Sequence, residues 1–280
     1  MKSVNKTQLI VISGSLLLIV LLLFANTQPP KNQEKPMMSE HAGNAASATT
    51  TINVLVENAK SKLSTAQKQQ MEKLEGALKT APDKKTAYEN MVNAWDSLNK
   101  QDVAAYYVEQ AAIVSPTETN WMEAGNRYYG ATRFAADADK PVLFGKAIEC
   151  FEKTIAINPK NVDARVNLGA CYVEGSTDPM KGIGMLKEVE KTDSNNVNLQ
   201  LNFAFFSEKS GQWDKAIARF QKVLKIKPDF IEAYLHLADA YQQKGDKENA
   251  IKNLEKYKSL VDDASIKTEV QDYINKLKNS

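Results

Sequence analysis

The chain has 280 residues, 43% of them hydrophobic and 25% charged, which suits a folded protein of one or two domains. Its net charge of +2 comes entirely from the four lysines and two glutamates that precede residue 51, so the rest of the chain is neutral. A neutral chain with only four arginines lacks the basic excess typical of nucleic-acid binders, and we expect no nucleic-acid partner.

The first predicted element is an uncharged apolar stretch of 17 residues, Leu9 to Ala25. As a helix it would reach about 25 Å, which is near the roughly 30 Å core of a bilayer. A cleaved signal peptide is the alternative, but Leu23 is too large for a cleavage site after Ala25, and no cysteine follows for a lipid anchor. We therefore expect a single-pass transmembrane helix over residues 9–25.

Charges around this stretch predict its orientation. Lys2 and Lys6 favour a cytoplasmic location for residues 1–8, although Lys31 and Lys35 on the other side act in the opposite sense. The remainder of the chain is then expected outside the cytoplasm, held at the inner membrane on the periplasmic side in a Gram-negative cell. Residues 26–50 contain prolines and small polar residues without an aromatic residue, and this composition predicts a disordered tether.

A sequence repeat of 34 residues follows. The clearest pair of matching stretches is Gly211-x-Trp213-x-x-Ala216-x-x-x-Phe220 and Gly245-x-Lys247-x-x-Ala250-x-x-x-Leu254. Apolar residues three and four apart give each predicted helix one apolar stripe. Small residues allow two helices to cross closely, and a bulky residue four places on fills the space beside the crossing. A single unit cannot bury its own apolar face, so the units must stack.

Earlier stretches carry the same pattern in a form that can be compared with known repeats: Trp121-x-x-Ala124-Gly125-x-x-Tyr128, then Ala147-x-x-x-Phe151 and Pro159, then Leu168-Gly169-x-x-Tyr172. Together these motifs resemble the tetratricopeptide repeat (TPR) family over residues 85–264. The resemblance implies an all-α fold, a TPR-type α-solenoid of antiparallel helix pairs.

The repeat pattern divides the chain into predicted segments. After residues 1–8, 9–25 and 26–50 come an N-terminal helical cap at 51–84, units at 85–117, 118–161, 162–196, 197–230 and 231–264, and a C-terminal capping helix at 265–280. The unit 118–161 has ten extra residues, and we expect both of its helices to be longer than usual. In the cap region, Ser64-x-x-Gln67 and Thr86-x-x-Glu89 both fit a capping box at a helix start.

The family resemblance also implies a binding surface, because such solenoids bind a peptide on the concave face, lined by the first helix of each unit. The residues expected to face this groove are Asn90, Met122, Asn126, Val166, Asn167, Leu201, Asn202, Phe205, Leu235, His236 and Asp239. Asn90, Asn167 and Asn202 occupy equivalent positions and resemble an asparagine ladder that holds a peptide backbone, since an amide both donates and accepts. The alternative is that asparagine is merely tolerated at exposed positions.

Other members of the family use a clamp of lysine and arginine for a carboxyl terminus, which this sequence lacks. Apolar residues occupy the corresponding positions: Met122, Val166, Leu201 and Leu235. We therefore expect a protein or peptide partner with hydrophobic side chains rather than a carboxylate tail.

Candidates for chemistry are few. Cys150 and Cys171 fall on neighbouring predicted helices and could pair in an oxidising compartment, but buried free thiols are the favoured interpretation. The sequence has two histidines, no phosphate-binding glycine loop and no hydrolase motif. We expect no catalytic residue, no metal site and no cofactor.

The sequence thus predicts a membrane-anchored scaffold or assembly factor that binds a protein partner. Alternatives from other classes are a periplasmic holding chaperone, an accessory protein of the translocon or of cytochrome maturation, and a cleaved soluble carrier. Whether the protein self-associates as a homo-oligomer stays open.

Overall fold

The computed structural model describes residues 51–176 and 178–279. The predicted tail, anchor and tether, residues 1–50, lie outside this part. Among the described residues every regular element is a helix, which confirms the predicted all-α class, and no helix there is both long and apolar enough to cross a membrane. The helices are α2 (Ile52–Ser61), α3 (Thr65–Thr80), α4 (Lys84–Ser97), α5 (Gln101–Val114), α6 (Glu118–Ala131), α7 (Lys140–Ile157), α8 (Val162–Gly175), α9 (Pro179–Thr192), α10 (Val197–Lys209), α11 (Trp213–Ile226), α12 (Glu232–Gln243), α13 (Lys247–Leu260) and α14 (Ala264–Asn279).

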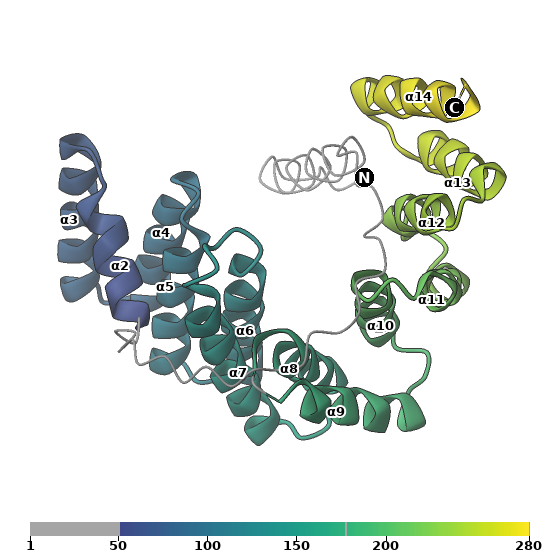
Figure 1. The fold of residues 1–280 in the computed structure, drawn as a ribbon. Coiled ribbons are helices and arrows are strands. Elements are labelled where there is room, and N and C mark those ends of the chain that lie inside the picture. The colour runs from purple at the N-terminus through teal and green to yellow at the C-terminus, as the bar shows by residue number, and fades with distance from the viewer. Residues whose placement is uncertain (1–50, 177, 280) are drawn as a thin grey trace, which may run out of the picture. The chain divides into compact units, whose positions relative to one another are not determined.

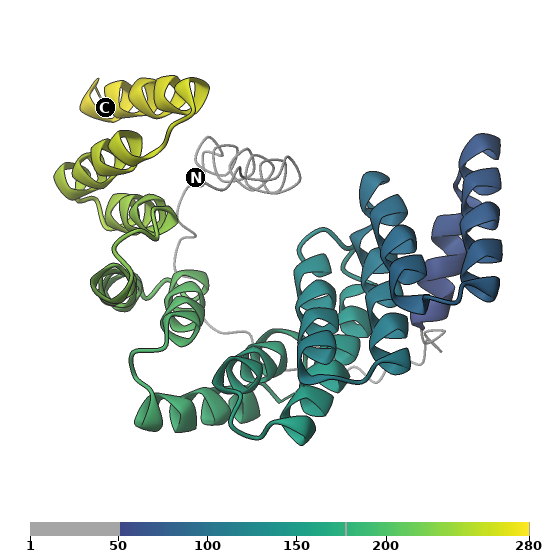
Figure 2. The ribbon, with the colours of Figure 1, turned by 180° about the vertical axis from the view of Figure 1, so that it is seen from behind.

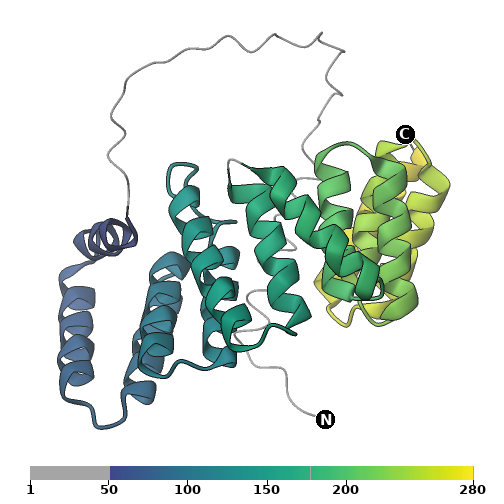
Figure 3. The ribbon, with the colours of Figure 1, turned by 90° about the horizontal axis from the view of Figure 1, so that it is seen from below.

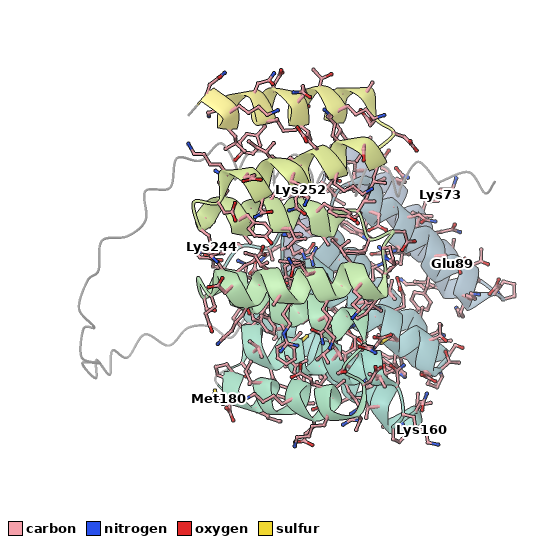
Figure 4. All side chains as sticks on the ribbon, turned by 90° about the vertical axis from the view of Figure 1, so that its right-hand side faces the viewer. Lys73, Glu89, Lys160, Met180, Lys244 and Lys252 are labelled. Carbon is pink, nitrogen blue, oxygen red and sulfur yellow. The ribbon has the colours of Figure 1, made fainter. Side chains whose placement is uncertain are left out.

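Helices α4 to α14 form a row in chain order, each in contact with the next (Figures 1 and 2). Five helix pairs follow one another: α4/α5, α6/α7, α8/α9, α10/α11 and α12/α13. We call the even-numbered member of each pair its first helix and the odd-numbered member its second helix. The step from α9 to α10 makes the fewest contacts of the row. Long polar side chains such as those of Lys73, Glu89 and Lys160 extend outward from the ribbon (Figure 4).

The turns inside the pairs depend on left-handed backbone. Gly211 between α10 and α11 has φ +69°, and Gly245 between α12 and α13 has φ +78°. Asn99 takes the same place after α4 with φ 55°, where its amide and that of Lys100 bond to the last carbonyls of the helix. Glycine and asparagine tolerate this conformation best, so these turns follow directly from the sequence.

Small residues set the distance between the paired helices, as predicted. A Cβ atom on Gly125 of α6 would lie 2.6 Å from Cε1 of Phe151 on α7, and one on Gly169 of α8 would lie 3.0 Å from Leu186 on α9. Phe151 and Leu186 are fully buried. The repeat motif therefore specifies both the close approach and the side chain that fills the space beside it.

Two local predictions are wrong. The extra length of unit 118–161 does not lengthen both helices: α6 has 14 residues, as α4 and α8 do, whereas α7 has 18, and residues 132–139 form the connection. The capping box at Thr86-x-x-Glu89 does not form either, because Asp83 starts α4 earlier by accepting hydrogen bonds from Lys85 and Thr86. An aspartate carboxylate caps a helix as well as a threonine hydroxyl does. Because Asp83 precedes Thr86 in the chain, Asp83 is the cap and Thr86 lies inside the first turn of α4.

The cap region contains two helices. Ser64 and Gln67 form the predicted capping box at the start of α3. Helix α2 runs at a steep angle to α3 and packs on α5 (Figure 3). At the other end, α14 buries the four apolar side chains of its predicted stripe: Val270, Tyr273, Ile274 and Leu277.

Candidate functional site

First helices of neighbouring pairs contact each other in the middle of the row. Helix α8 packs against both α6 and α10, whereas neighbouring second helices make at most marginal contact in the described part of the chain. The first helices therefore form the more closely packed side of the row. We call the surface formed by α4, α6, α8, α10 and α12 the first-helix face.

Four asparagines cross this face from helix to helix. Asn167 Nδ2 on α8 donates to Asn126 Oδ1 on α6 over 2.9 Å, and Asn198 Nδ2 on α10 donates to Asn167 Oδ1 over 2.7 Å. Asn202, one turn further along α10, donates to Oδ1 of Asn198 over 3.0 Å. This asparagine row, Asn126, Asn167, Asn198 and Asn202, places donors and acceptors in a fixed alternating order across three successive first helices.

Other polar pairs continue the line at both ends. Arg127 Nη1 on α6 donates to Asp96 Oδ2 on α4 over 2.8 Å. At the other end, Nδ1 of His236 on α12 lies 3.5 Å from Oε2 of Glu208 on α10. Tyr273 Oη on α14 donates to Oε1 of Gln242 on α12. Each step from α4 to α14 along the even-numbered helices thus has a polar contact across it.

The predicted groove residues divide into accessible and inaccessible ones. Asn90 and Asn126 are exposed, whereas Asn167 and Asn202 are only 8% and 7% exposed. Val166 is completely buried and Leu235 is 6% exposed, so neither can offer an apolar surface to a partner. The expectation for these two residues is wrong because their stripe of the helix faces the core between the pairs.

Three further predicted residues are half-buried and pack against the edge of the hydrophobic core. Met122 packs against the apolar cluster of α5 to α8, and Leu201 against that of α10 to α12. Phe205 lies edge-on to Phe220, with ring centroids 5.6 Å apart, and edge-on to His236 at 4.9 Å. The apolar lining expected of the groove is therefore largely used for packing, and the accessible part of the face is polar.

His236 and Asp239 lie together on α12. The His236 ring stacks on Phe220 with a centroid distance of 5.0 Å and an interplanar angle of 9°. Burial raises the pKa of Asp239, while a hydrogen bond from Gln243 and the nearby His236 oppose that shift. These contacts fix His236 at the α10–α12 junction, whereas the contacts of Asp239 are with other residues of α12.

A second line of asparagines ties the starts of the first helices together. Asn161 caps α8 through Oδ1, 2.7 Å from the amide of Ala164, while its Nδ2 donates to Glu118 in the first turn of α6. Asn196 does the same for α10, with Oδ1 on the amide of Leu199 and Nδ2 on Asp163 of α8. Each side chain thus caps its own helix and bonds to the preceding first helix.

Several participants were missed by the sequence analysis: Asn198, Arg127, Asp96, Glu208 and Gln242. For Asn198 a signal existed, because it stands one helical turn before Asn202, on the same face of α10. For the charged residues no local signal distinguishes a bridge between units from an ordinary solvent-exposed side chain. Their partners lie about 30 residues away in the chain.

The cysteines are buried free thiols, as favoured by the sequence. Burial raises the pKa of the Cys150 thiol to about 12 and that of Cys171 even further. Within residues 51–176 and 178–279 no group of three side chains is arranged to hold a metal ion. The first-helix face therefore offers hydrogen bonds and a few charges as its means of recognition.

Comparisons with known proteins agree with this architecture. Residues 209–245 match a family model described as TPR repeat, and residues 231–260 match one described as Tetratricopeptide repeat. No curated protein matches the chain.

Solved structures with a similar fold include a thermophilic TPR protein of Thermus thermophilus, with 18% identity and a TM-score of 0.50 over 67% of this chain and 97% of that one. A tetratricopeptide repeat protein from Parabacteroides merdae has 16% identity and a TM-score of 0.49, over 81% of this chain and 88% of that one. The type IV pilus biogenesis factor PilW has 16% identity and a TM-score of 0.48, over 78% of this chain and 95% of that one. At such identities the likeness concerns the fold alone. Residues 209–260 thus carry tetratricopeptide repeats, and the stacked helix pairs of α4 to α13 have the architecture of a tetratricopeptide repeat solenoid.

Proposed function

We propose that the protein is a scaffold that binds an extended segment of a protein partner along the first-helix face. Tetratricopeptide repeat proteins are in general non-catalytic scaffolds for protein–protein interaction. The observation that carries the proposal is the asparagine row, which crosses three first helices and leaves amide groups over for a ligand. Among residues 51–176 and 178–279, Asn126 bonds only through its Oδ1, so both N–H donors of its exposed amide remain available.

The hydrogen bonds within the asparagine row favour binding because they orient its side chains before a partner arrives. Because Asn167 bonds to both Asn126 and Asn198, neither neighbour has to be ordered when a partner arrives. A peptide backbone presents donors and acceptors whatever its sequence, so an amide row suits an extended chain. The partner's side chains would then be selected by the charged ends of the line, Asp96 with Arg127 and Glu208 with His236.

We also propose that residues 9–25 anchor the protein in a membrane and that the helix row lies on the non-cytoplasmic side. The support is the apolar sequence and the lysines before it. Extraction of native membranes with alkaline carbonate and protease treatment of intact spheroplasts test this directly. The protein should stay in the membrane pellet and be degraded from outside. Release by carbonate, or protection from the protease, would contradict the anchor or the orientation.

An affinity capture with matched variants tests the scaffold proposal. Asn126→Asp keeps the acceptor for Asn167 but replaces the free N–H groups with a negative charge. Asn275→Asp on α14 is the matched control, because Asn275 Oδ1 likewise accepts one hydrogen bond, from Gln271. After brief cross-linking, one stoichiometric partner should be recovered with the wild type and with the control, and about tenfold less with Asn126→Asp.

Two other results of this experiment would contradict the proposal. Equal recovery with both variants would remove Asn126 from the binding surface. Recovery of many unrelated proteins, together with suppressed aggregation of a test protein, would replace the dedicated scaffold with a holding chaperone.

A further inference from the structure

A half-open cavity of about 210 Å³ lies beside α2, apart from the asparagine row. One stripe of α2 faces it, with residues spaced three and four apart, and α5 supplies the opposite wall. The lining residues are Asn53, Val56, Glu57, Lys60, Leu78, Tyr88, Tyr106, Tyr107 and Gln110. Helix α2 belongs to no helix pair, so this cavity, which we call the α2 cavity, is not a feature of the repeat itself.

The walls of the α2 cavity are held in place by polar bonds between three helices. Lys60 on α2 lies 2.8 Å from Glu75 on α3 and 3.3 Å from Glu57. Tyr107 on α5 donates to the same Glu75 over 3.3 Å. The apolar side of α2 is buried in the core through Leu55, Val56 and Ala59. The cavity therefore has a rigid frame rather than a collapsible one.

Three tyrosine rings dominate the lining. Tyr106 and Tyr107 meet edge to face, with ring centroids 5.1 Å apart, and Tyr88 adds a third ring from α4. Burial raises the pKa of Tyr88, and it raises that of Tyr107 to about 12. The hydroxyls of Tyr88 and Tyr107 therefore stay protonated at neutral pH; that of Tyr107 already donates to Glu75, and that of Tyr88 can donate to a ligand.

Several hydrogen-bonding groups in the lining are unused. Within the described part of the chain, the hydroxyls of Tyr88 and Tyr106 and the side-chain amides of Asn53 and Gln110 bond to no protein group. Lys60 has a third N–H beyond the two that point to carboxylates. A ligand that fits must offer several acceptors together with flat apolar surface.

The charged residues of the α2 cavity further restrict the kind of ligand that it can bind. Lys60 is the only basic residue among those that line the α2 cavity, and both Glu57 and Glu75 are paired with it. An anionic ligand would therefore find no uncompensated positive charge. The unused donors and the tyrosine rings, rather than the charges, then favour a ligand with carbonyl acceptors and ring surfaces.

We propose that the α2 cavity binds an extended, proline-containing segment of a partner protein. Such a segment adopts the polyproline II conformation, has no internal hydrogen bonds and exposes its carbonyls, and aromatic-lined grooves are the surfaces that recognise it. The proline rings pack on Tyr88 and Tyr106, and the free hydroxyls and amides donate to the carbonyls. The inference does not depend on the partner of the first-helix face, because no residue of the asparagine row lines this cavity.

Fluorine NMR of the full-length protein in non-ionic detergent tests the proposal. Tyrosines are replaced biosynthetically with 3-fluorotyrosine, and the signals are assigned with single Tyr→Phe variants. The probe is decaproline, and a decapeptide of alanine and glutamine is the control ligand. Decaproline should shift the signals of Tyr88, Tyr106 and Tyr107 in a saturable way and leave those of Tyr234 and Tyr241 unchanged.

Variants separate the cavity from the rest of the protein. The double variant Tyr88→Phe/Tyr106→Phe keeps the rings and removes two donors, so decaproline should bind about tenfold more weakly, read from Tyr107. Tyr234→Phe on α12 should bind as the wild type does. The absence of any shift at millimolar decaproline, an equal response to the proline-free peptide, or unchanged affinity of the double variant would each overturn the proposal.

Discussion

At the scale of single residues, two glycines on one helix have opposite consequences. A Cβ on Gly125 would lie 2.6 Å from the buried ring of Phe151, whereas one on Gly130 would meet nothing within 4 Å. Gly125→Ala should therefore destabilise the protein by about 1–3 kcal/mol through overpacking. Gly130→Ala should be neutral or stabilising by up to about 1 kcal/mol, because alanine favours helix. Urea unfolding followed by circular dichroism measures both; similar changes for the two variants would contradict the packing described.

A buried carboxylate gives a second test at this scale. Glu109 is 3% exposed, accepts a hydrogen bond from Tyr128 Oη over 2.6 Å and pairs with Lys146 at 3.2 Å. Glu109→Ala leaves a buried hydroxyl without an acceptor and should cost about 2–4 kcal/mol. Glu149→Ala removes the other, half-exposed partner of Lys146 and should cost less than about 0.5 kcal/mol. Equal unfolding midpoints for the two variants would show that the buried contact contributes nothing.

Contacts at this scale could be predicted from the sequence wherever the relevant neighbour is local. The small residues and Phe151 were found because their spacing recurs with the repeat. The use of Asn167 was misjudged in part, because both of its partners, Asn126 and Asn198, lie on other helices and more than 30 residues away. Val166 was misplaced because the rotation of α8 about its own axis depends on packing against its neighbours.

At the scale of elements, the starts of the first helices are coupled through their caps. Asn196 caps α10 and bonds to Asp163 of α8 over 3.2 Å. Asn196→Asp preserves the cap but sets two carboxylates against each other at the protein surface, which should cost about 0.5–1 kcal/mol. The repulsion requires both groups to be ionised, so the loss should be present at neutral pH and disappear in acid.

The control for this prediction is Asn196→Ser, which keeps a capping oxygen and adds no charge. Its effect on the thermal unfolding midpoint should not change between neutral and acidic solution, nor with added salt. A loss in Asn196→Asp that is the same at both pH values would mean that Asp163 does not face the cap.

Elements outside the repeat were the hardest to place from sequence. The capping box at Ser64 located the start of α3, but the position of α2 follows from no repeat. Its stripe of Leu55, Val56 and Ala59 fits any apolar surface, and only the folded chain shows that α5 provides it. The α2 cavity could not be predicted for this reason, because the sequence does not show that its three tyrosines lie next to α2.

At the scale of the whole helix row, stability arises between neighbours. Each pair packs against its neighbours in the row, as in other repeat proteins. A destabilising substitution in one pair should therefore affect that pair and its neighbours more than distant pairs. The α9–α10 step has the fewest contacts in the row, but two bonds from α8 also join the pair α8/α9 to α10: Asn198 with Asn167, and Asn196 with Asp163. Asn167 and Asn198 therefore combine two roles, because they join the two halves of the row and form the centre of the proposed binding surface.

Site-specific photo-cross-linking in the native cell tests the central claim that the first-helix face binds the partner. Benzoylphenylalanine is placed at exposed Asn90 on α4 and, for comparison, at exposed Lys187 on α9 or Lys225 on α11. We predict that the first-helix position yields one discrete cross-linked partner and that the second-helix positions yield none. A partner that cross-links from Lys187 or Lys225 but not from Asn90 would contradict the claim and assign binding to the opposite side of the row.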